Sequence, residues 1–252
     1  MTAMPNANVL DNAAWAALSG PHAHLAQTHG QVARYPVDMS PFVGFTDDAT
    51  DQAWDDLAAL AGPGVVVALS GIKLQPPPDW EVVGEGSGVQ LVDRSLQTAP
   101  DPEAQVLGLA DVADMLALVA RAQPGPFGPR TIELGTYLGI RRGGELVAMA
   151  GERLHPPGWV EISAVCTDEA YRGQGLATRL VRAVAAGIRG RGETPFLHAA
   201  ASNTPAIRLY LALGFELRRK TTFLAVRTPE RWRSPSPEDT RRSAETLSSV
   251  PD

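Results

Sequence analysis

VEISAVCTDEAYRGQGLATRLVRAVAAGI, residues 160–188, is the stretch of this 252-residue chain that decides the fold. Its pattern predicts an apolar strand, a loop with two glycines, and an amphipathic helix whose apolar residues recur every three or four positions. The loop, Arg172-Gly173-Gln174-Gly175-Leu176-Ala177, places small residues where the helix begins. A helix N-terminus presents unpaired N–H groups and partial positive charge, so the loop is typical of a phosphate-binding site.

The composition is that of a globular protein, with 44% hydrophobic residues, 20% charged residues and a net charge of −6. Residues 1–100 hold 11 acidic but only 3 basic side chains, which argues against nucleic acid as the main partner and permits an amine-bearing one. No apolar run is long enough for a membrane span and no secretory signal is recognisable. The single cysteine, Cys166, excludes an intramolecular disulfide, and we expect a cytoplasmic protein.

The chain is expected to have three parts, of which residues 1–97 form a divergent N-terminal half with a role at an acceptor site or an interface. Residues 98–228 alternate helix and strand, which predicts an α/β fold of the α+β kind, with helices flanking a mixed, curved sheet. Residues 229–252 are polar and rich in proline and serine, so we predict a disordered tail.

Within these parts, the apolar patterns and the glycine and proline positions predict individual elements. The predicted helices are 13–34 (broken near Gly20-Pro21), 50–61, 101–123, 176–189 and 205–213. The predicted strands are 65–69, a hairpin of 80–83 and 89–92, and then 133–140, 145–153, 159–167, 196–200 and 215–226.

Two motifs occur together in the second part. Arg172-x-x-Gly175-x-Ala177 follows an apolar strand, and NTPAIRLYLALGF, residues 203–215, lies downstream. The first resembles the acyl-CoA signature of the GNAT superfamily of N-acetyltransferases, Arg/Gln-x-x-Gly-x-Gly/Ala, and the second resembles that superfamily's next signature at the usual distance. The resemblance covers about half of the chain and implies a GNAT-like sheet, with a degenerate copy of the same fold as one interpretation of the N-terminal half.

The resemblance implies acetyl-CoA as co-substrate and no metal. Backbone N–H groups of the glycine loop would bind the pyrophosphate, and the strand before it would pair with the pantetheine arm. Asn203 would cap the following helix near the cofactor. The predicted cofactor-binding residues are Val165, Thr167, Arg172, Gly173, Gln174, Gly175, Leu176, Ala177, Thr178 and Asn203.

Acyl transfer to an amine also needs a proton donor and a proton acceptor. Tyr210 matches the superfamily's tyrosine general acid, which protonates the departing thiolate. Glu161 is the leading candidate for the base, because the resemblance places a glutamate on this strand. Glu133, Glu152 and the absence of a dedicated base remain alternatives. Cys166 suggests an acyl-enzyme, but a buried strand thiol usually packs as a small hydrophobe, so we expect direct attack in a ternary complex.

We therefore predict an acyl-CoA-dependent N-acyltransferase that moves acetyl from acetyl-CoA to a primary amine of a small molecule or peptide. A non-catalytic CoA-binding regulatory or interaction module is the alternative, and a homodimer is one expected assembly. The sequence contains no Gly-Lys-Ser/Thr phosphate loop and no Rossmann glycine triplet followed by an acidic residue, which argues against a nucleotide-binding protein. The residues expected to line the acceptor pocket are Phe127, Arg130, Thr131, Glu133 and Tyr137.

Overall fold

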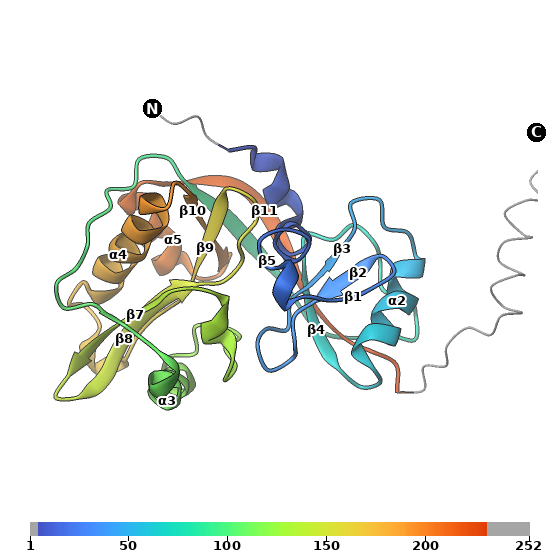
Figure 1. The fold of residues 1–252 in the computed structure, drawn as a ribbon, viewed down its shortest axis with the longest axis horizontal. Helices are drawn as coiled ribbons and strands as arrows, with labels where there is room; N and C mark the ends of the chain where they lie inside the picture. Colours follow the sequence, from blue (N-terminus) through green and yellow to red (C-terminus); the bar gives the residue numbers. More distant parts are fainter. Residues whose placement is uncertain (1–4, 231–252) are drawn as a thin grey trace, which may run out of the picture.

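A computed structural model describes residues 5–230 (Figure 1). An eight-stranded mixed sheet runs through the molecule in the order β4-β11-β5-β10-β9-β8-β7-β6, and a three-stranded sheet, β1-β2-β3, lies beside it. The strands of the large sheet are β4 (Val66–Ser70), β5 (Glu81–Asp93), β6 (Gln105–Val106), β7 (Tyr137–Arg142), β8 (Glu145–Glu152), β9 (Trp159–Thr167), β10 (Thr194–Ala200) and β11 (Phe215–Arg227).

Helices cover both faces of the large sheet. The helices are α1 (Ala13–Leu18), α2 (Gln52–Ala61), α3 (Val112–Ala122), α4 (Leu176–Gly190) and α5 (Thr204–Leu213). Leu180 and Val184 of α4 belong to one core cluster with Ala148 and Ala150 of β8, whereas Met115 of α3 belongs to another with Met149. Alternate residues of β8 therefore serve two separate cores, as the period of two in a strand requires. The predicted α/β fold is confirmed.

The N-terminal part repeats the topology of the C-terminal part. In the first, β1 (Gln27–His29), β2 (Val32–Arg34) and β3 (Val43–Phe45) pair antiparallel, and α2 then leads to β4, whose Ala68 forms a parallel bridge with Phe42, the residue before β3. In the second, β7, β8 and β9 pair antiparallel, and α4 leads to the parallel strand β10. This repetition supports the interpretation of the N-terminal half as a degenerate copy.

The two parts are joined by their long strands. β5 pairs with β10 of the other part, β11 pairs with β4, and β5 and β11 pair with each other. Figure 1 shows these two strands crossing the middle of the molecule, between α4 and α5 on one side and α2 on the other. Strands from before and after the expected boundary at residues 97 and 98 therefore belong to one large sheet. The expected boundary does not separate two sheets.

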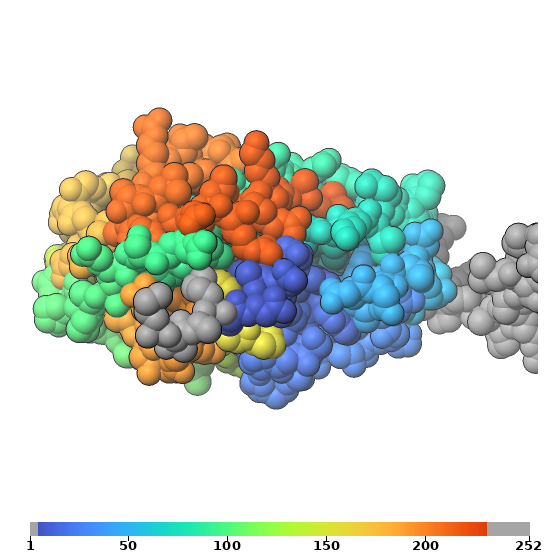
Figure 2. Space-filling view, turned by 90° about the horizontal axis from the view of Figure 1, so that it is seen from above, coloured from blue at the N-terminus to red at the C-terminus, as the bar shows by residue number. Residues whose placement is uncertain are grey.

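The N-terminal segment fills the junction between the parts. Leu10 and Ala17 lie in one buried cluster with Trp159 and Phe196 of the C-terminal part. Figure 2 shows this segment, in dark blue, beside the orange-red C-terminal strand. Asp11 reaches that strand directly and forms ion pairs with Arg218 at 2.8 Å and Arg219 at 2.7 Å.

Most of the predicted elements are confirmed, including α2, β4 and the series from β8 to β11, but three are wrong in part. The helix expected over 13–34 ends at Leu18, and the chain then forms β1 and β2 around Gly30, whose φ is +50°. The helix expected over 101–123 begins only at Val112, because β6 precedes it. The strand expected from residue 133 begins at Tyr137 after a 3₁₀ turn.

The hairpin expected over 80–83 and 89–92 is also wrong, because β5 is one uninterrupted strand. Its glycines suggested a turn, but at Gly88 the small residue serves close packing in the sheet, because a Cβ there would clash with the ring of Phe223 on β11. Among residues 5–230, no helix is long and apolar enough to cross a membrane. The predicted tail lies outside the described residues from 231 onward.

Candidate functional site

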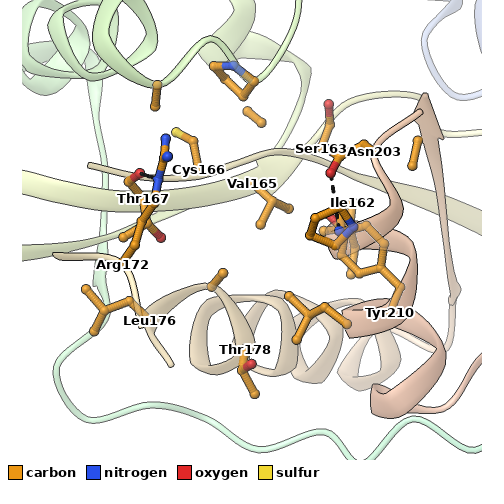
Figure 3. A pocket seen from close by; sticks show the side chains of 18 of the residues that line it. Ile162, Ser163, Val165, Cys166, Thr167, Arg172, Leu176, Thr178, Asn203 and Tyr210 are labelled. Atoms are coloured by element: carbon orange, nitrogen blue, oxygen red, sulfur yellow. Dashed lines mark hydrogen bonds between the residues drawn. The ribbon is translucent and has the colours of Figure 1, made fainter. Parts of the chain in front are cut away.

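A cavity opens where β9 and β10 diverge. The two strands pair only from Trp159 to Glu161 on β9 and from Thr194 to Phe196 on β10. Beyond these residues the strands separate, and a cavity of about 690 Å³ lies between β9, the start of α4, and α5. Figure 3 shows α4 running along one side of this cavity and β9 along the other.

The backbone of β9 is strained in the wall of this cavity. Met149 pairs with Cys166 and Gly151 with Ser163, so Ala164 and Val165 together face one residue of β8. This is a β-bulge, and Ala164 adopts a φ of +52° within it. Such a conformation costs a non-glycine residue on the order of 1 kcal/mol and is found mainly at functional sites. The bulge removes two residues of the cavity wall from regular pairing with β8.

The glycine loop forms the end of the cavity where α4 begins. Gly173 and Gly175 have φ values of +79° and +73°, and a Cβ on either would meet no atom within 4 Å. The first helical hydrogen bond is donated by Arg179 to the carbonyl of Gly175, at 3.1 Å. Within the described chain, the N–H groups of residues 176–178 therefore have no acceptor, and the first turn carries no acidic residue. The loop can surround an anion such as a diphosphate.

Other predicted cofactor residues also line the cavity, among them Val165, Thr167 and Asn203. The Oγ1 atom of Thr167 is buried and has no hydrogen-bond partner among residues 5–230, so it is available to a ligand. The Oδ1 atom of Asn203 accepts a hydrogen bond of 3.2 Å from the N–H of Ala206 and caps α5. Of the ten predicted residues, only Gln174 is absent from the cavity lining.

Tyr210 lies on α5 at the end of the cavity away from Arg172 (Figure 3). Its side chain is 8% exposed, and burial raises the pKa of its phenol to about 12. The phenol therefore stays protonated near neutral pH and can donate a hydrogen bond or a proton. Burial also raises the pKa of the Cys166 thiol to about 12, so Cys166 is not a thiolate and is a poor nucleophile.

Glu161 does not reach the cavity, which argues against its expected role as the direct base. Its side chain is 0% exposed and accepts hydrogen bonds from Arg153 Nε at 2.8 Å and Nη2 at 2.7 Å. Burial alone would raise the pKa of Glu161, but Arg153 and a hydrogen bond to His198 hold it well below its usual range. An ionised, enclosed carboxylate of this kind is a weak proton acceptor.

The other carboxylates considered as bases are also held in ion pairs. Glu152 accepts a hydrogen bond from Arg191 at 2.8 Å, and Glu133 binds Arg130 at 2.7 and 2.8 Å. The expected acceptor-pocket residues do not line the cavity between β9 and α5. Arg130 is bound by Glu133, and Thr131 donates a hydrogen bond of 2.6 Å to the carbonyl of Met39.

His198 lines the cavity, although the sequence predicts no role for it. It lies on β10, and it also lines a smaller cavity of about 20 Å³ on the side of the N-terminal segment. The sequence around it, Phe196-Leu197-His198-Ala199-Ala200, is typical of an ordinary buried strand. Among the described residues, no group of three or more histidine, cysteine or acidic side chains is placed to hold a metal ion.

The fold and the glycine-loop cavity define a class of acyltransferase, and comparison with known proteins identifies the family. Residues 137–224 match a family model described as FR47-like protein. A solved structure from Novosphingobium aromaticivorans DSM 12444, described as an acetyltransferase from the GNAT family, is 38% identical with a TM-score of 0.79, and the match covers 86% of this chain and 97% of that one. The chain belongs to the GNAT family of N-acetyltransferases.

Two further relatives show different extents of similarity. A GCN5-related N-acetyltransferase from Kribbella flavida shares the fold at 18% identity and a TM-score of 0.57, over 90% of this chain and 97% of that one. N-alpha-acetyltransferase RimI of Mycobacterium tuberculosis (strain ATCC 25618 / H37Rv) is 38% identical over 90 residues, which are 33% of this chain and 56% of that protein. This match therefore spans about half the length of the curated relative.

Proposed function

We propose that this protein transfers an acetyl group from acetyl-CoA to a primary amine by direct attack in a ternary complex. The observation that carries the proposal is one continuous cavity that joins the glycine loop, the strained segment of β9, and Tyr210. These are a diphosphate site, a polar backbone edge and a hydrogen-bond donor, arranged along a single path. Cytoplasmic location is part of the same proposal.

The residues present fit the coenzyme. The open loop at Gly173 and Gly175 leaves room for a diphosphate, and the N–H groups of residues 176–178 have no acceptor in the part of the chain that the structure describes. The backbone of Val165 and Thr167 would hold the pantetheine arm, with the unpartnered Oγ1 of Thr167 beside it. When bound, acetyl-CoA supplies a thioester whose carbonyl carbon is open to attack by an amine.

Tyr210 is the proposed hydrogen-bond donor to the leaving sulfur. With a pKa of about 12, the phenol keeps its proton while it stabilises negative charge on the leaving sulfur by a hydrogen bond. Full transfer of the proton is uphill, because thiols are stronger acids with pKa values of about 8.5. Tyr210 therefore contributes through a hydrogen bond that strengthens as charge develops on sulfur.

The acceptor is proposed to enter from the side of the N-terminal half. The small cavity at His198 shares Arg219 and Thr221 with an open hollow of about 480 Å³. Both lysines of the chain, Lys73 and Lys220, line this hollow, and its described lining contains no carboxylate. In a protein of net charge −6, this basic lining supports an acceptor that carries an anionic group besides its amine.

The relatives support an amine acceptor without identifying it. The RimI relative is named for acetylation of an α-amino group, which is consistent with either a peptide N-terminus or a free amino acid here. The alternative is a CoA-binding module without catalysis, in which the coenzyme stabilises an interaction surface. Catalysis is favoured, because Tyr210 lies in the same cavity as the glycine loop and a binding module would not require it.

The test combines binding and turnover. Isothermal titration is expected to show one acetyl-CoA per chain, with binding abolished by Gly175→Trp, whose side chain would fill the loop. Gly192→Trp is the matched control, because Gly192 also has a positive φ of +80° and open space within 4 Å of where a Cβ would lie, but follows the C-terminal end of α4. Equal binding by a folded Gly175→Trp variant would exclude the glycine loop as the coenzyme site.

Turnover is measured as release of free CoA thiol with a panel of amines. The panel pairs each amino acid or short peptide with its C-terminal amide, so that only the carboxylate differs within a pair. Release with the carboxylates above that with the amides supports the basic hollow as part of the acceptor site. Stoichiometric binding without thiol release for any amine would favour the non-catalytic module.

A further inference from the structure

A second hollow lies in the N-terminal part, at the place that the large cavity between β9 and β10 occupies in the C-terminal part. The chain at the start of β3 meets β4 in the bridge between Phe42 and Ala68, just as β9 and β10 pair over their first residues. Beyond this bridge, a hollow of about 170 Å³ lies between residues 45–49 and residues 70–74. We call it the β3–β4 hollow. Figure 1 shows this end of the molecule, with α2, opposite the end that carries α4.

The β3–β4 hollow is unsuited to a second coenzyme. The loop before α4 carries Gly173 and Gly175 at positive φ, whereas the loop before α2, residues 46–51, has three aspartates and no glycine. Carboxylates at a helix N-terminus repel a diphosphate. The volume is also much smaller, about 170 Å³ against about 690 Å³. A cavity of about 150 Å³ holds one benzene molecule, so the hollow suits a ligand of roughly that size.

The wall of the β3–β4 hollow contains a polar atom that the protein leaves unpaired. The Oγ1 atom of Thr46 is buried and forms no hydrogen bond among residues 5–230. The backbone of Thr46 is bonded, because its N–H donates to the carbonyl of Gln31 at 2.9 Å and its carbonyl accepts from the N–H of Ala49 at 3.1 Å. A buried hydroxyl without a partner costs free energy, and a ligand that binds it removes that cost.

Two charged side chains of the lining lack an ionic partner. Asp47 belongs to the loop between β3 and α2 and Lys73 to the segment after β4, and neither forms an ion pair within the described chain. Asn12 holds Asp47 in place, because its Nδ2 atom donates to Oδ1 of Asp47 at 2.9 Å. Asp11, the third charged residue of the lining, is already bound by two arginines of β11. The hollow therefore offers one carboxylate and one ammonium group to a ligand.

We propose that the β3–β4 hollow binds a free α-amino acid with a small apolar side chain. The ammonium group of the ligand donates hydrogen bonds to Asp47 and to Oγ1 of Thr46, and its carboxylate binds Lys73. The apolar residues of the lining, which receive the side chain, are Phe45, Ala49, Ile72 and Leu74. No residue lines both this hollow and the large cavity, so the site is separate from the coenzyme site. It does not depend on the proposed function.

The first test varies the ligand in the absence of acetyl-CoA. NMR titration of the whole protein compares L-valine with L-valinamide, which lacks the carboxylate, and with N-acetyl-L-valine, which lacks the ammonium group. One molecule of L-valine is expected to bind per chain, and each derivative about tenfold more weakly or worse, because each loses a hydrogen-bonded charge. Absence of L-valine binding, or equal binding of the three compounds, would overturn the proposal.

The second test assigns each ligand charge to its partner. Asp47→Asn is expected to remove most of the preference for L-valine over N-acetyl-L-valine, and Lys73→Met most of the preference over L-valinamide. Asp48→Asn and Lys220→Met are the matched controls, because Asp48 follows Asp47 outside the lining and Lys220 lines only the basic hollow. Folded Asp47→Asn and Lys73→Met variants that keep both preferences would contradict the assigned contacts.

The third test places the ligand in one hollow or the other. Thr46→Val keeps the shape of the side chain, and it is expected to weaken L-valine binding about fivefold without lowering the stability of the free protein. Ala49→Phe should fill the β3–β4 hollow and prevent binding, whereas Ala201→Phe should fill only the basic hollow and leave binding intact. The opposite result for these two variants would locate the amino acid in the basic hollow and exclude this site.

A bound amino acid would also affect the basic hollow, because Lys73 lines both hollows. Its carboxylate would lower the positive charge available to an anionic acceptor, so L-valine should raise the KM of that acceptor in the wild-type protein but not in Ala49→Phe. An equal increase in Ala49→Phe would show competition at the acceptor site instead of an effector site. This consequence rests on the proposed function: if no amine is acetylated, that function fails, while the binding tests still decide the amino-acid site.

Discussion

Arg153 binds Glu161 in a bidentate ion pair that is enclosed by the two parts of the molecule. The exposed fractions of the two side chains are 12% and 0%, and the guanidinium lies 4.5 Å above the ring of Phe42 from the N-terminal part. A pair this deeply buried contributes little net stability as a pair, because both charges lose their hydration. Removing one partner is different, because it leaves the other charge buried and alone.

Glu161→Ala is therefore expected to lower the free energy of unfolding by about 3–5 kcal/mol, measured by urea denaturation. The double variant Arg153→Met/Glu161→Leu should recover much of that loss, since neither charge remains. Arg130→Ala serves as the control, because its ion pair with Glu133 is solvent-exposed and its loss should have a much smaller effect. Equal losses for the buried and exposed pairs would contradict this account.

The glycine-loop region could be predicted from the sequence because its signals are local. Residues 160–188 contain a strand, two glycines at positive φ and a helix, and each depends mainly on its own neighbours. The pairing of β5 with β10 and of β11 with β4, which joins the two parts, depends instead on strands that are far apart in the sequence. The glycines of β5 indicated a turn, but β5 pairs along its length with the distant β11, whose Phe223 ring leaves no room for a side chain at Gly88.

The same difference explains why the surroundings of Glu161 could not be predicted. Glu161 was recognised through its strand, but burial and the contact with Arg153 arise only in the folded molecule. His198 lies 37 residues from Glu161 and 108 from Gln90, and no periodicity in the sequence relates these three side chains. Tyr210 was recognisable because it occupies a fixed position in a motif that forms one short helix.

Tyr210→Phe is expected to lower kcat by about 100-fold while the acetyl-CoA dissociation constant changes little. The ring still fills its place, but the hydrogen bond to the leaving sulfur is lost. Tyr171→Phe is the matched control, because Tyr171 lines the same cavity beside the glycine loop at Arg172. Thiol-release kinetics and isothermal titration provide the two readouts, and a Tyr210→Phe variant with normal kcat would exclude Tyr210 as the donor.

His22 is expected to make the protein sensitive to acid. Its ring is buried, hydrogen-bonded to the hydroxyl of Tyr35 at 2.9 Å, and stacked on His155 at 4.6 Å. Burial, with a contribution from His155, lowers the pKa of His22 from 6.5 to about 3. The unfolded chain therefore binds a proton below about pH 6.5 that the folded protein excludes, and stability falls as the pH drops from there toward 3.

The slope from this one group is at most about 1.4 kcal/mol per pH unit. Urea denaturation of the wild-type protein and of His22→Gln at pH 7 and pH 5 measures it, because carboxylates common to both cancel in the difference. The wild-type protein should lose more stability than the variant between these values. Parallel losses would show that His22 does not exclude the proton.

The strained backbone of Ala164 is expected to lower the free energy of unfolding of the protein. Its φ of +52° is unfavourable for any residue with a Cβ, and most unfavourable for a β-branched one. Ala164→Gly should therefore be neutral or stabilising by up to about 1 kcal/mol, whereas Ala164→Val should destabilise the protein. Ala148→Gly is the control, because Ala148 of β8 pairs with Ile140 and Thr167 and has no positive φ, and it should be destabilising because glycine weakens a buried strand. Thermal and urea unfolding measure these changes, and a loss of stability in Ala164→Gly equal to that in Ala148→Gly would show that the bulge stores no strain.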